Sequence, residues 1–356
     1  MKRVRAITLA MPLSAIFLGI LASMFLIALT GVSPFAVLKT LVTDGFGLSG
    51  KVAPLFMTLG TSTPLMLTGL AAMLGFKVGV FSIAQEGQYV VGAVIAAWLG
   101  ASLDLPAFIA VPLILVLSMM AAALYGLIPA LLRVKLGVNE IISSIMMNNI
   151  ATFMLEYLVA FPLRADAGQK AQSAVINRDY WLYQFIYGSR WGLSFVIAVL
   201  LLIACYFVMY KTSSGYKIRM VGQNINFASY GGIRSDRVTI VTLTVGAAIA
   251  GLAGSMEVLG NYHRIMTGFS SGLGFDGLSV AMLGLSHPVG VFIVAILLAG
   301  IRQGAQLGLQ ISLSVPRELG AVLIALVILF VAISDVYRPY VEKLLSSRKN
   351  KKRSEG

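Results

Sequence analysis

Long apolar segments separated by short polar ones recur along the whole chain. A helix needs roughly 20 apolar residues to cross the hydrocarbon of a bilayer. Ten segments meet that length with some tolerance: 7–30, 53–75, 80–100, 106–132, 140–161, 191–210, 238–260, 268–285, 289–310 and 318–334. The eighth is short and glycine-rich, so eight spans is the fallback count. The pattern predicts an all-α polytopic membrane protein with about ten transmembrane helices.

Composition supports this fold class and excludes others. Of the 356 residues, 58% are hydrophobic and 12% are charged, whereas soluble globular domains carry about 25% charged residues. The net charge of +13 does not indicate nucleic-acid binding, because the basic residues flank apolar segments rather than forming one face. The single cysteine, Cys205, excludes an internal disulfide and a cysteine-based zinc site. We expect no cofactor, no metal and no catalytic residue.

The distribution of Lys and Arg predicts the orientation in the membrane. With the N-terminus inside, the inner segments hold more than twice as many basic residues as the outer ones, as the positive-inside rule requires. We therefore expect both ends inside, in a single transmembrane domain over 1–356. Residues 163–190 would form an extracytoplasmic loop, 211–237 a cytoplasmic loop and 335–356 a basic cytoplasmic tail.

A weak internal repeat is visible in two places. Residues 69–73 (GLAAM) end the second predicted span, and 251–256 (GLAGSM) lie late in the seventh. Each is followed by a glycine-rich, interrupted helix with an acidic residue, Glu86 or Asp276. The predicted topology makes the two halves antiparallel, as in an inverted repeat whose broken helices line a transport pathway. The alternative is coincidence, because Gly and Ala are common in any membrane helix.

Polar side chains lie where apolar ones are expected. A carboxylate at membrane depth costs several kcal/mol, so it usually faces a water-filled cavity or a partner. Eight residues are the candidates to line a pathway: Ser82, Gln85, Glu86, Gln88, Asn139, Glu140, Asn148 and Asp276. Such groups can instead join helices by hydrogen bonds. One hypothesis for function is a proton-coupled secondary transporter in which Glu86 or Asp276 carries the proton.

The 211–237 loop has the features of a docking segment. Asn224 can cap a short helix, and Gly231 and Gly232 can end it. Phe227 and Tyr230 give this helix apolar surface outside the membrane, which favours docking into a groove of a soluble partner.

This loop closely resembles the coupling segment of ATP-binding-cassette importer permeases of the sugar, nucleoside and branched-chain amino acid group. The matching residues are Thr212, Gly215, Arg219, Gly222, Gln223, Asn224, Ala228, Ser229, Gly232 and Ile233. Met220 stands where the family usually has Ala, and Ser229 replaces a second Ala. Three further segments, 79–88, 137–148 and 274–288, resemble the other family signatures in the family's order.

The resemblance implies a permease subunit without enzymatic activity, in the cytoplasmic membrane of a bacterium. Its implied partners are a cytoplasmic ATPase, a second permease subunit in a heterodimer, an extracytoplasmic substrate-binding protein and the lipid bilayer. The G-V-N-E segment at 137–140 is typical of the nucleoside branch, and simple sugars are the alternative substrates. The residues expected to couple to the ATPase are Gly215, Arg219, Gly222, Asn224, Phe227, Ala228, Tyr230 and Gly232. A proton-coupled transporter would not need such a segment.

Overall fold

The computed structural model describes residues 18–19, 21–28, 33–48, 53–165, 171–186, 188–270 and 272–305, with 322, 325–326 and 329–330 beyond them. Most of the first and tenth predicted spans, and the whole basic tail, lie outside the described residues. Within the described ranges the structure is helical, and its β pairing is limited to isolated bridges. The chain divides into two units, Leu55–Ala299 and the two flanking regions together, which we describe separately.

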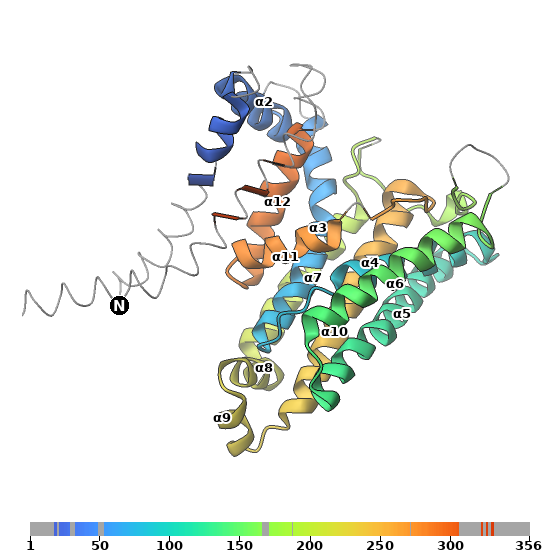
Figure 1. Ribbon diagram of the computed structural model, residues 1–356. Coiled ribbons are helices and arrows are strands. Elements are labelled where there is room, and N and C mark those ends of the chain that lie inside the picture. Colours follow the sequence, from blue (N-terminus) through green and yellow to red (C-terminus); the bar gives the residue numbers. More distant parts are fainter. Residues whose placement is uncertain are drawn as a thin grey trace, which may run out of the picture. The chain divides into compact units, whose positions relative to one another are not determined.

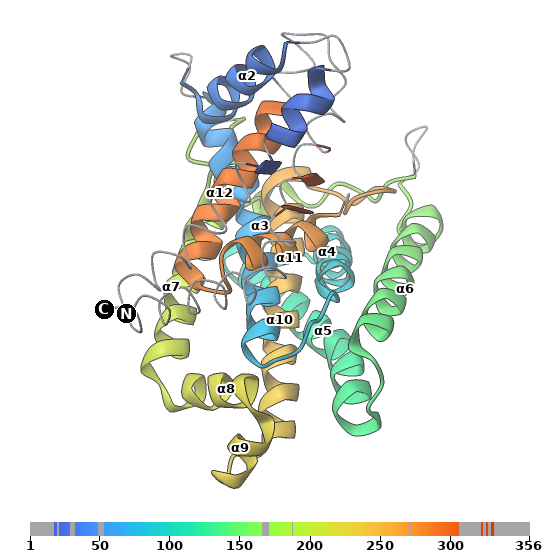
Figure 2. The ribbon, with the colours of Figure 1, turned by 60° about the vertical axis from the view of Figure 1, so that its left-hand side comes forward.

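The larger unit contains all the segments that resemble the permease signatures (Figures 1 and 2). Its helices are α3 (Ala53–Lys77), α4 (Gln85–Ser102), α5 (Ala107–Leu136), α6 (Glu140–Ala160), η1 (Arg178–Tyr180), α7 (Leu193–Lys211), α8 (Ser213–Gln223), α9 (Ile225–Tyr230), α10 (Ser235–Glu257), the π-helical turn η2 (Val258–Tyr262), α11 (Leu273–Leu283) and α12 (Pro288–Gly304), whose last turn belongs to the other unit. Five helices are long and apolar enough to cross a membrane: α3, α5, α6, α7, and α10 together with η2. The chain is therefore a multi-pass helical membrane protein in the part that the structure describes.

Two predicted spans begin later than the sequence indicated. The third was predicted over 80–100, but α4 begins at Gln85, because the preceding segment is non-helical from Gly79, where φ is +82°. The eighth was predicted over 268–285, but α11 has only 11 residues. At 1.5 Å per residue such a helix covers about 16 Å, roughly half of the hydrocarbon thickness. As predicted, each of these two spans is interrupted: its helix begins only after a non-helical segment that contains glycine.

The centre of the larger unit is built from helices that pack through small residues. In the 18-residue apolar stretch of α3, 83% of the residues are buried, whereas in those of α5 and α7 only 22% are buried. Gly92 of α4 lies directly against the backbone of Gly251 in α10, and a side chain at either position would overlap the neighbouring helix. Gly254 is pressed in the same way against the backbone of Tyr89, and Gly251 also meets Ala122 of α5. Close backbone approach at Gly and Ala is the usual way in which membrane helices associate.

The outer helices present apolar side chains away from this centre. Leu124 of α5, Phe153 of α6 and Phe207 of α7 are all exposed. Such large apolar side chains on membrane-spanning helices are accounted for by contact with lipid.

Helices α3 and α10 run in opposite directions (Figures 1 and 2), and Gly246 of α10 lies close to the backbone of Ala71 in α3. Each is followed by a non-helical segment and then by a helix that contains one of the acids, α4 with Glu86 and α11 with Asp276. This arrangement is the one that an inverted repeat requires.

The segment between α6 and α7 folds onto the end of α10. The backbone N–H of Leu182 donates to the carbonyl of Leu259, and that of Ile176 donates to the carbonyl of His263. The His263 ring stacks on Trp181 with centroids 3.7 Å apart. Burial lowers the pKa of His263 below its ordinary value, which favours the neutral form of the imidazole.

The smaller unit contains a helix that the hydrophobic pattern did not predict. Helix α2 (Pro34–Phe46) begins with Pro at its first position after Ser33 and ends at Gly47, where φ is +69°. Pro at the start and Gly after the end are recognisable helix signals, but the 13-residue segment is too short to register as a span. Gly45 of α2 lies against Gly300 at the end of α12.

The central packing makes a prediction about stability. Gly251→Val should lower the melting temperature of the detergent-solubilised chain, because the added carbons overlap Ala122 and Ser118 at a cost of about 1–3 kcal/mol or more. Val245→Leu, on the exposed side of the same helix, is the matched control and should change little. Equal melting temperatures for the two variants would contradict the close packing of α4, α5 and α10.

Candidate functional site

A small polar cavity lies among α3, α4, α5, α6 and α10. Its volume is about 20 Å³, which is room for a single water molecule. Four of the eight predicted pathway residues line it: Ser82, Gln85, Gln88 and Glu140. The sequence analysis thus found half of its candidates around one internal space.

Two buried polar atoms at this cavity lack a partner. Gln85 Oε1 and Ser144 Oγ make no hydrogen bond within the described part of the chain, and both side chains line the cavity. Leaving a buried polar group unpaired costs about 1–3 kcal/mol. The cavity is therefore suited to a polar occupant, such as water or a polar solute.

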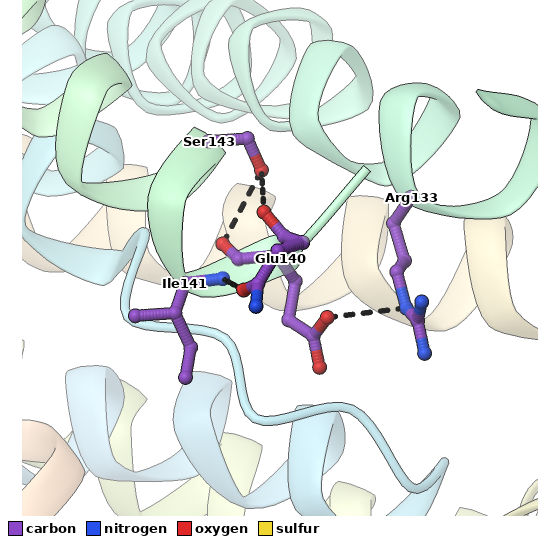
Figure 3. Close-up of polar contacts among 5 residues, drawn as sticks. Arg133, Glu140, Ile141 and Ser143 are labelled. Atoms are coloured by element: carbon purple, nitrogen blue, oxygen red, sulfur yellow. Dashed lines mark hydrogen bonds and ion pairs between the residues drawn. The ribbon is translucent and has the colours of Figure 1, made fainter. Parts of the chain in front are cut away.

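An ion pair lies on the wall of the cavity (Figure 3). Arg133 Nε is 3.2 Å from Glu140 Oε2. The turn between α5 and α6 brings them together: α5 ends at Gly137 with φ of +67°, and Asn139 caps α6 by accepting a hydrogen bond from the Ile141 N–H at 2.9 Å. Because the Arg133 side chain is 42% exposed, the pair contributes little to stability, about 1 kcal/mol or less.

A second, larger cavity adjoins the first. Its volume is about 440 Å³, and it is lined by the α3–α4 segment, the end of α5 and the segment from α8 to the start of α10. The two cavities share Val80 and Arg133. The ion pair with Glu140 therefore lies at the boundary between an inner polar space and an outer space beside α8 and α9.

Glu86 does not line either cavity. The residue is 6% exposed, and its carboxylate accepts hydrogen bonds from the Ser270 hydroxyl and, at 2.7 Å, from the Gly274 N–H. The N–H groups at the start of α11 are free to bind an acceptor, and the helix dipole favours a negative charge there. Glu86 thus joins the start of α4 to the start of α11, and Asp276 lies partly exposed one turn into α11.

The two predicted asparagines also make local contacts. Asn148 of α6 accepts from the Gly87 N–H and donates to the Ile83 carbonyl, both at 2.8 Å, so it holds the start of α4. Asn139 is the cap of α6 and is exposed. Whether these residues contact a transported solute remains a prediction.

The predicted docking segment forms two helices. The short helix expected after Asn224 is confirmed as α9: the Asn224 side chain accepts from the Phe227 N–H at 3.0 Å, and the helix ends before Gly231 and Gly232. Helix α8, capped by Thr212, was not predicted as a helix.

The eight predicted coupling residues separate into those that attach or shape the segment and two aromatic residues that do neither. Gly215 lies against the α7 backbone and Gly222 against the backbone of residues 77–79, while Ala228 is buried in a cluster with Val78, Val80 and Val221. Arg219 lies over the Tyr210 ring, 5.3 Å from its centroid, and Asn224 and Gly232 shape the ends of α9.

Phe227 and Tyr230 face outward instead, with 63% and 93% of their surface exposed. The other coupling residues thus attach and shape the segment, while these two aromatic side chains are available to a partner.

Sequence reasoning missed Arg133, which it counted only as a topology signal. The signal that could have found it is the turn at Gly137–Asn139, which folds α6 back beside the end of α5. Ser144 was likewise not among the predicted site residues.

The fold and the site define a class: a multi-pass helical membrane protein with an internal polar cavity and a two-helix segment that presents aromatic side chains. Residues 55–332 match the family described as branched-chain amino acid transport system / permease component. The chain belongs to this family of permeases.

The relatives include transporter permeases of several substrates. A guanosine ABC transporter permease of Bacillus subtilis is 36% identical over 344 residues, covering 94% of this chain and 96% of the relative. A nucleoside ABC transporter permease of Lactococcus lactis is 29% identical and covers 97% of each chain. A glucose ABC transporter permease of Haloferax volcanii is 31% identical over 84% of this chain and 79% of the relative. No solved structure matches the chain.

The neighbouring residues Gln85 and Glu86 should differ in their effect on stability. Glu86→Met removes the acceptor of two hydrogen bonds and leaves their donors unpaired, so it should lower the melting temperature by an amount that corresponds to roughly 1.5–3 kcal/mol. Gln85→Met has a similar length and removes an acceptor without a partner, so it should be neutral or stabilising. A thermal melt of the purified chain in detergent would test both, and a larger loss for Gln85→Met would contradict the assignment.

Proposed function

We propose that this chain is one of two membrane-spanning permease subunits of an ATP-driven nucleoside importer in a bacterial cytoplasmic membrane. Membership of the permease family supports the transport role. The guanosine and nucleoside permeases, which match nearly end to end, support nucleosides as the solute. A separate cytoplasmic ATPase supplies the energy, and an extracytoplasmic binding protein delivers the solute.

The second permease subunit is a different chain. Bacillus subtilis has another guanosine ABC transporter permease, 24% identical to this chain over 245 residues. Lactococcus lactis has another nucleoside permease, 22% identical over 260 residues. Two different permeases for one solute class in each organism, which match this chain to different degrees, support a heterodimer.

The proposed topology is the one that the basic residues predict. Ten segments cross the membrane with both ends inside, within a single domain over 1–356, and the eighth crosses partly as non-helical chain and partly as α11. Residues 163–190 lie outside, and residues 211–237 and the 335–356 tail lie inside. The opposite directions of α3 and α10 support an inverted repeat that includes the broken helices at Glu86 and Asp276.

One observation carries the mechanism: the docking segment packs onto the residues that lead into the polar cavity. Gly222 touches residues 77–79, and Ala228 is buried against Val78 and Val80. From there the chain continues through Ser82 to Gln85, both of which line the inner cavity. When the ATPase moves α9, the displacement reaches this segment through direct backbone and side-chain contacts.

The same displacement acts on the boundary between the two cavities. Val80 and Arg133 line both, so a shift of Val80 changes the wall that Arg133 and Glu140 form. We assign to this route the four predicted pathway residues that line the inner cavity, Ser82, Gln85, Gln88 and Glu140. A role in the pathway for Glu86, Asn139, Asn148 and Asp276 stays a prediction.

The alternatives are weaker. A simple sugar is the second candidate solute, because the glucose permease is also a relative. A proton-coupled mechanism would use Glu86 or Asp276, but both Glu86 oxygens are engaged by Ser270 and Gly274.

The direct test is uptake by the complete assembly in proteoliposomes. We expect ATP-dependent uptake of labelled guanosine, competed by other nucleosides and not by glucose. Phe227→Asp with Tyr230→Asp should abolish uptake, because the charges enter an apolar groove without partners. Phe227→Leu with Tyr230→Phe keeps apolar surface and should retain most of the activity. Wild-type uptake by the Asp variant, with the ATPase still bound, would contradict the coupling site, and competition by glucose would contradict the solute.

Orientation can be checked by labelling from each side of the membrane. Single cysteines at Ser214 and Asp179, both exposed, in a Cys205→Ala background should react with impermeant thiol reagents from opposite sides. Ser214 should react only when the cytoplasmic face is accessible. Labelling of both from the same side would show that the topology is wrong.

A further inference from the structure

A third cavity lies between α8 and the first turns of α10, on the side away from the polar site. Its volume is about 430 Å³. Figure 2 shows α8 lying crosswise beside the start of α10, and the two helices are in contact. None of the residues assigned above to the solute pathway lines this cavity.

Three cationic side chains line the cavity. Lys217 comes from α8, and Arg234 and Arg237 come from the start of α10, three residues apart and therefore on one face. No carboxylate lines the cavity, and no ion pair joins these three side chains to an acid among the described residues. The N-terminus of α10 adds a partial positive charge at the same place. The cavity is therefore built for an anion.

The remaining wall is mostly apolar, apart from Ser214 and Thr242, and continues toward the membrane. Ile218 and Val238 line the cavity, as does Val241, which is 53% exposed. One turn further along the spanning part of α10, Val245 is 48% exposed. An occupant with an anionic head and an apolar body would satisfy both parts of this surface.

The depth of the cavity fits the head-group level of a bilayer. The cations stand where α10 begins, and apolar residues dominate this helix from Val238 onward. Helix α7, another spanning helix, ends at Lys211, just before α8. Basic pockets at this level between membrane helices bind anionic lipid head groups.

We propose that this cavity binds an anionic phospholipid, with its phosphate among Lys217, Arg234 and Arg237 and an acyl chain along Val241 and Val245. A free phosphate or nucleotide would use the cations but not the apolar wall. The proposal does not depend on the transported solute, and its test uses the chain without the ATPase, so it can fail while the proposed function holds.

The test is lipid binding to the purified full chain in detergent, followed by native mass spectrometry with phosphatidylglycerol or phosphatidylcholine. Wild type should bind phosphatidylglycerol in preference, and inorganic phosphate should not displace it. Arg234→Gln with Arg237→Gln should weaken phosphatidylglycerol binding roughly thirtyfold. Lys135→Gln with Lys211→Gln removes the same charge from other helix ends that do not line the cavity, and should weaken it less than threefold.

Lys217→Gln keeps the test valid if the double variant does not fold, because it removes one cation from the other helix and should weaken binding about fivefold. Equal losses in the cavity and control variants would overturn the proposal in favour of a diffuse electrostatic effect. Displacement by inorganic phosphate would overturn it in favour of a free-anion site. Equal affinity for phosphatidylcholine would overturn it outright.

Discussion

The close approach of α4 and α10 at Gly92 and Gly251 is the contact on which the larger unit depends. Two helix backbones can come this close only where a side chain is missing, and the contact is extended by Gly254 against the Tyr89 backbone of α4 and by Gly251 against Ala122 of α5. Because water does not drive helices together within lipid, such close packing supplies the attraction. It also fixes the starts of the broken helices, and so the positions of the polar groups near them.

Those polar groups are of two kinds, those with hydrogen-bond partners in the protein and those without. Glu86 and Asn148 bind N–H and C=O groups that the broken helices leave unpaired, so they hold the fold. Gln85 and Ser144 have no such partner and face an internal space. Glu86 thus fits the interpretation that intramembrane polar residues join helices. Its neighbour Gln85 fits the interpretation that they line a pathway.

The docking segment shows a comparable division. Its glycines and Ala228 press it against α7 and the α3–α4 segment, and Phe227 and Tyr230 are left for a partner. Because the segment is packed this closely, a displacement of α9 also displaces the residues under it, whereas a flexible loop could move without displacing them. The proposed route from an ATPase to the cavity therefore needs no distant relay, because Val80 belongs both to the cluster under α9 and to the cavity wall.

The sequence by itself determined the membrane class, five of the long spans to within a few residues, the capped helix after Asn224 and the family, since apolar length, capping residues and signature segments are local properties. It did not determine which of two adjacent polar residues faces the cavity. Gln85 and Glu86 point about 100° apart around the helix axis, and only the positions of α6, α10 and α11 decide what each one meets. In the sequence, Arg133 is only a basic residue at the end of a span. In the structure, the turn at Gly137 places Glu140 beside it. The turn signal shows that the two helices fold back on each other, but which side chains then meet depends on how the helices pack, and this the tertiary structure decides.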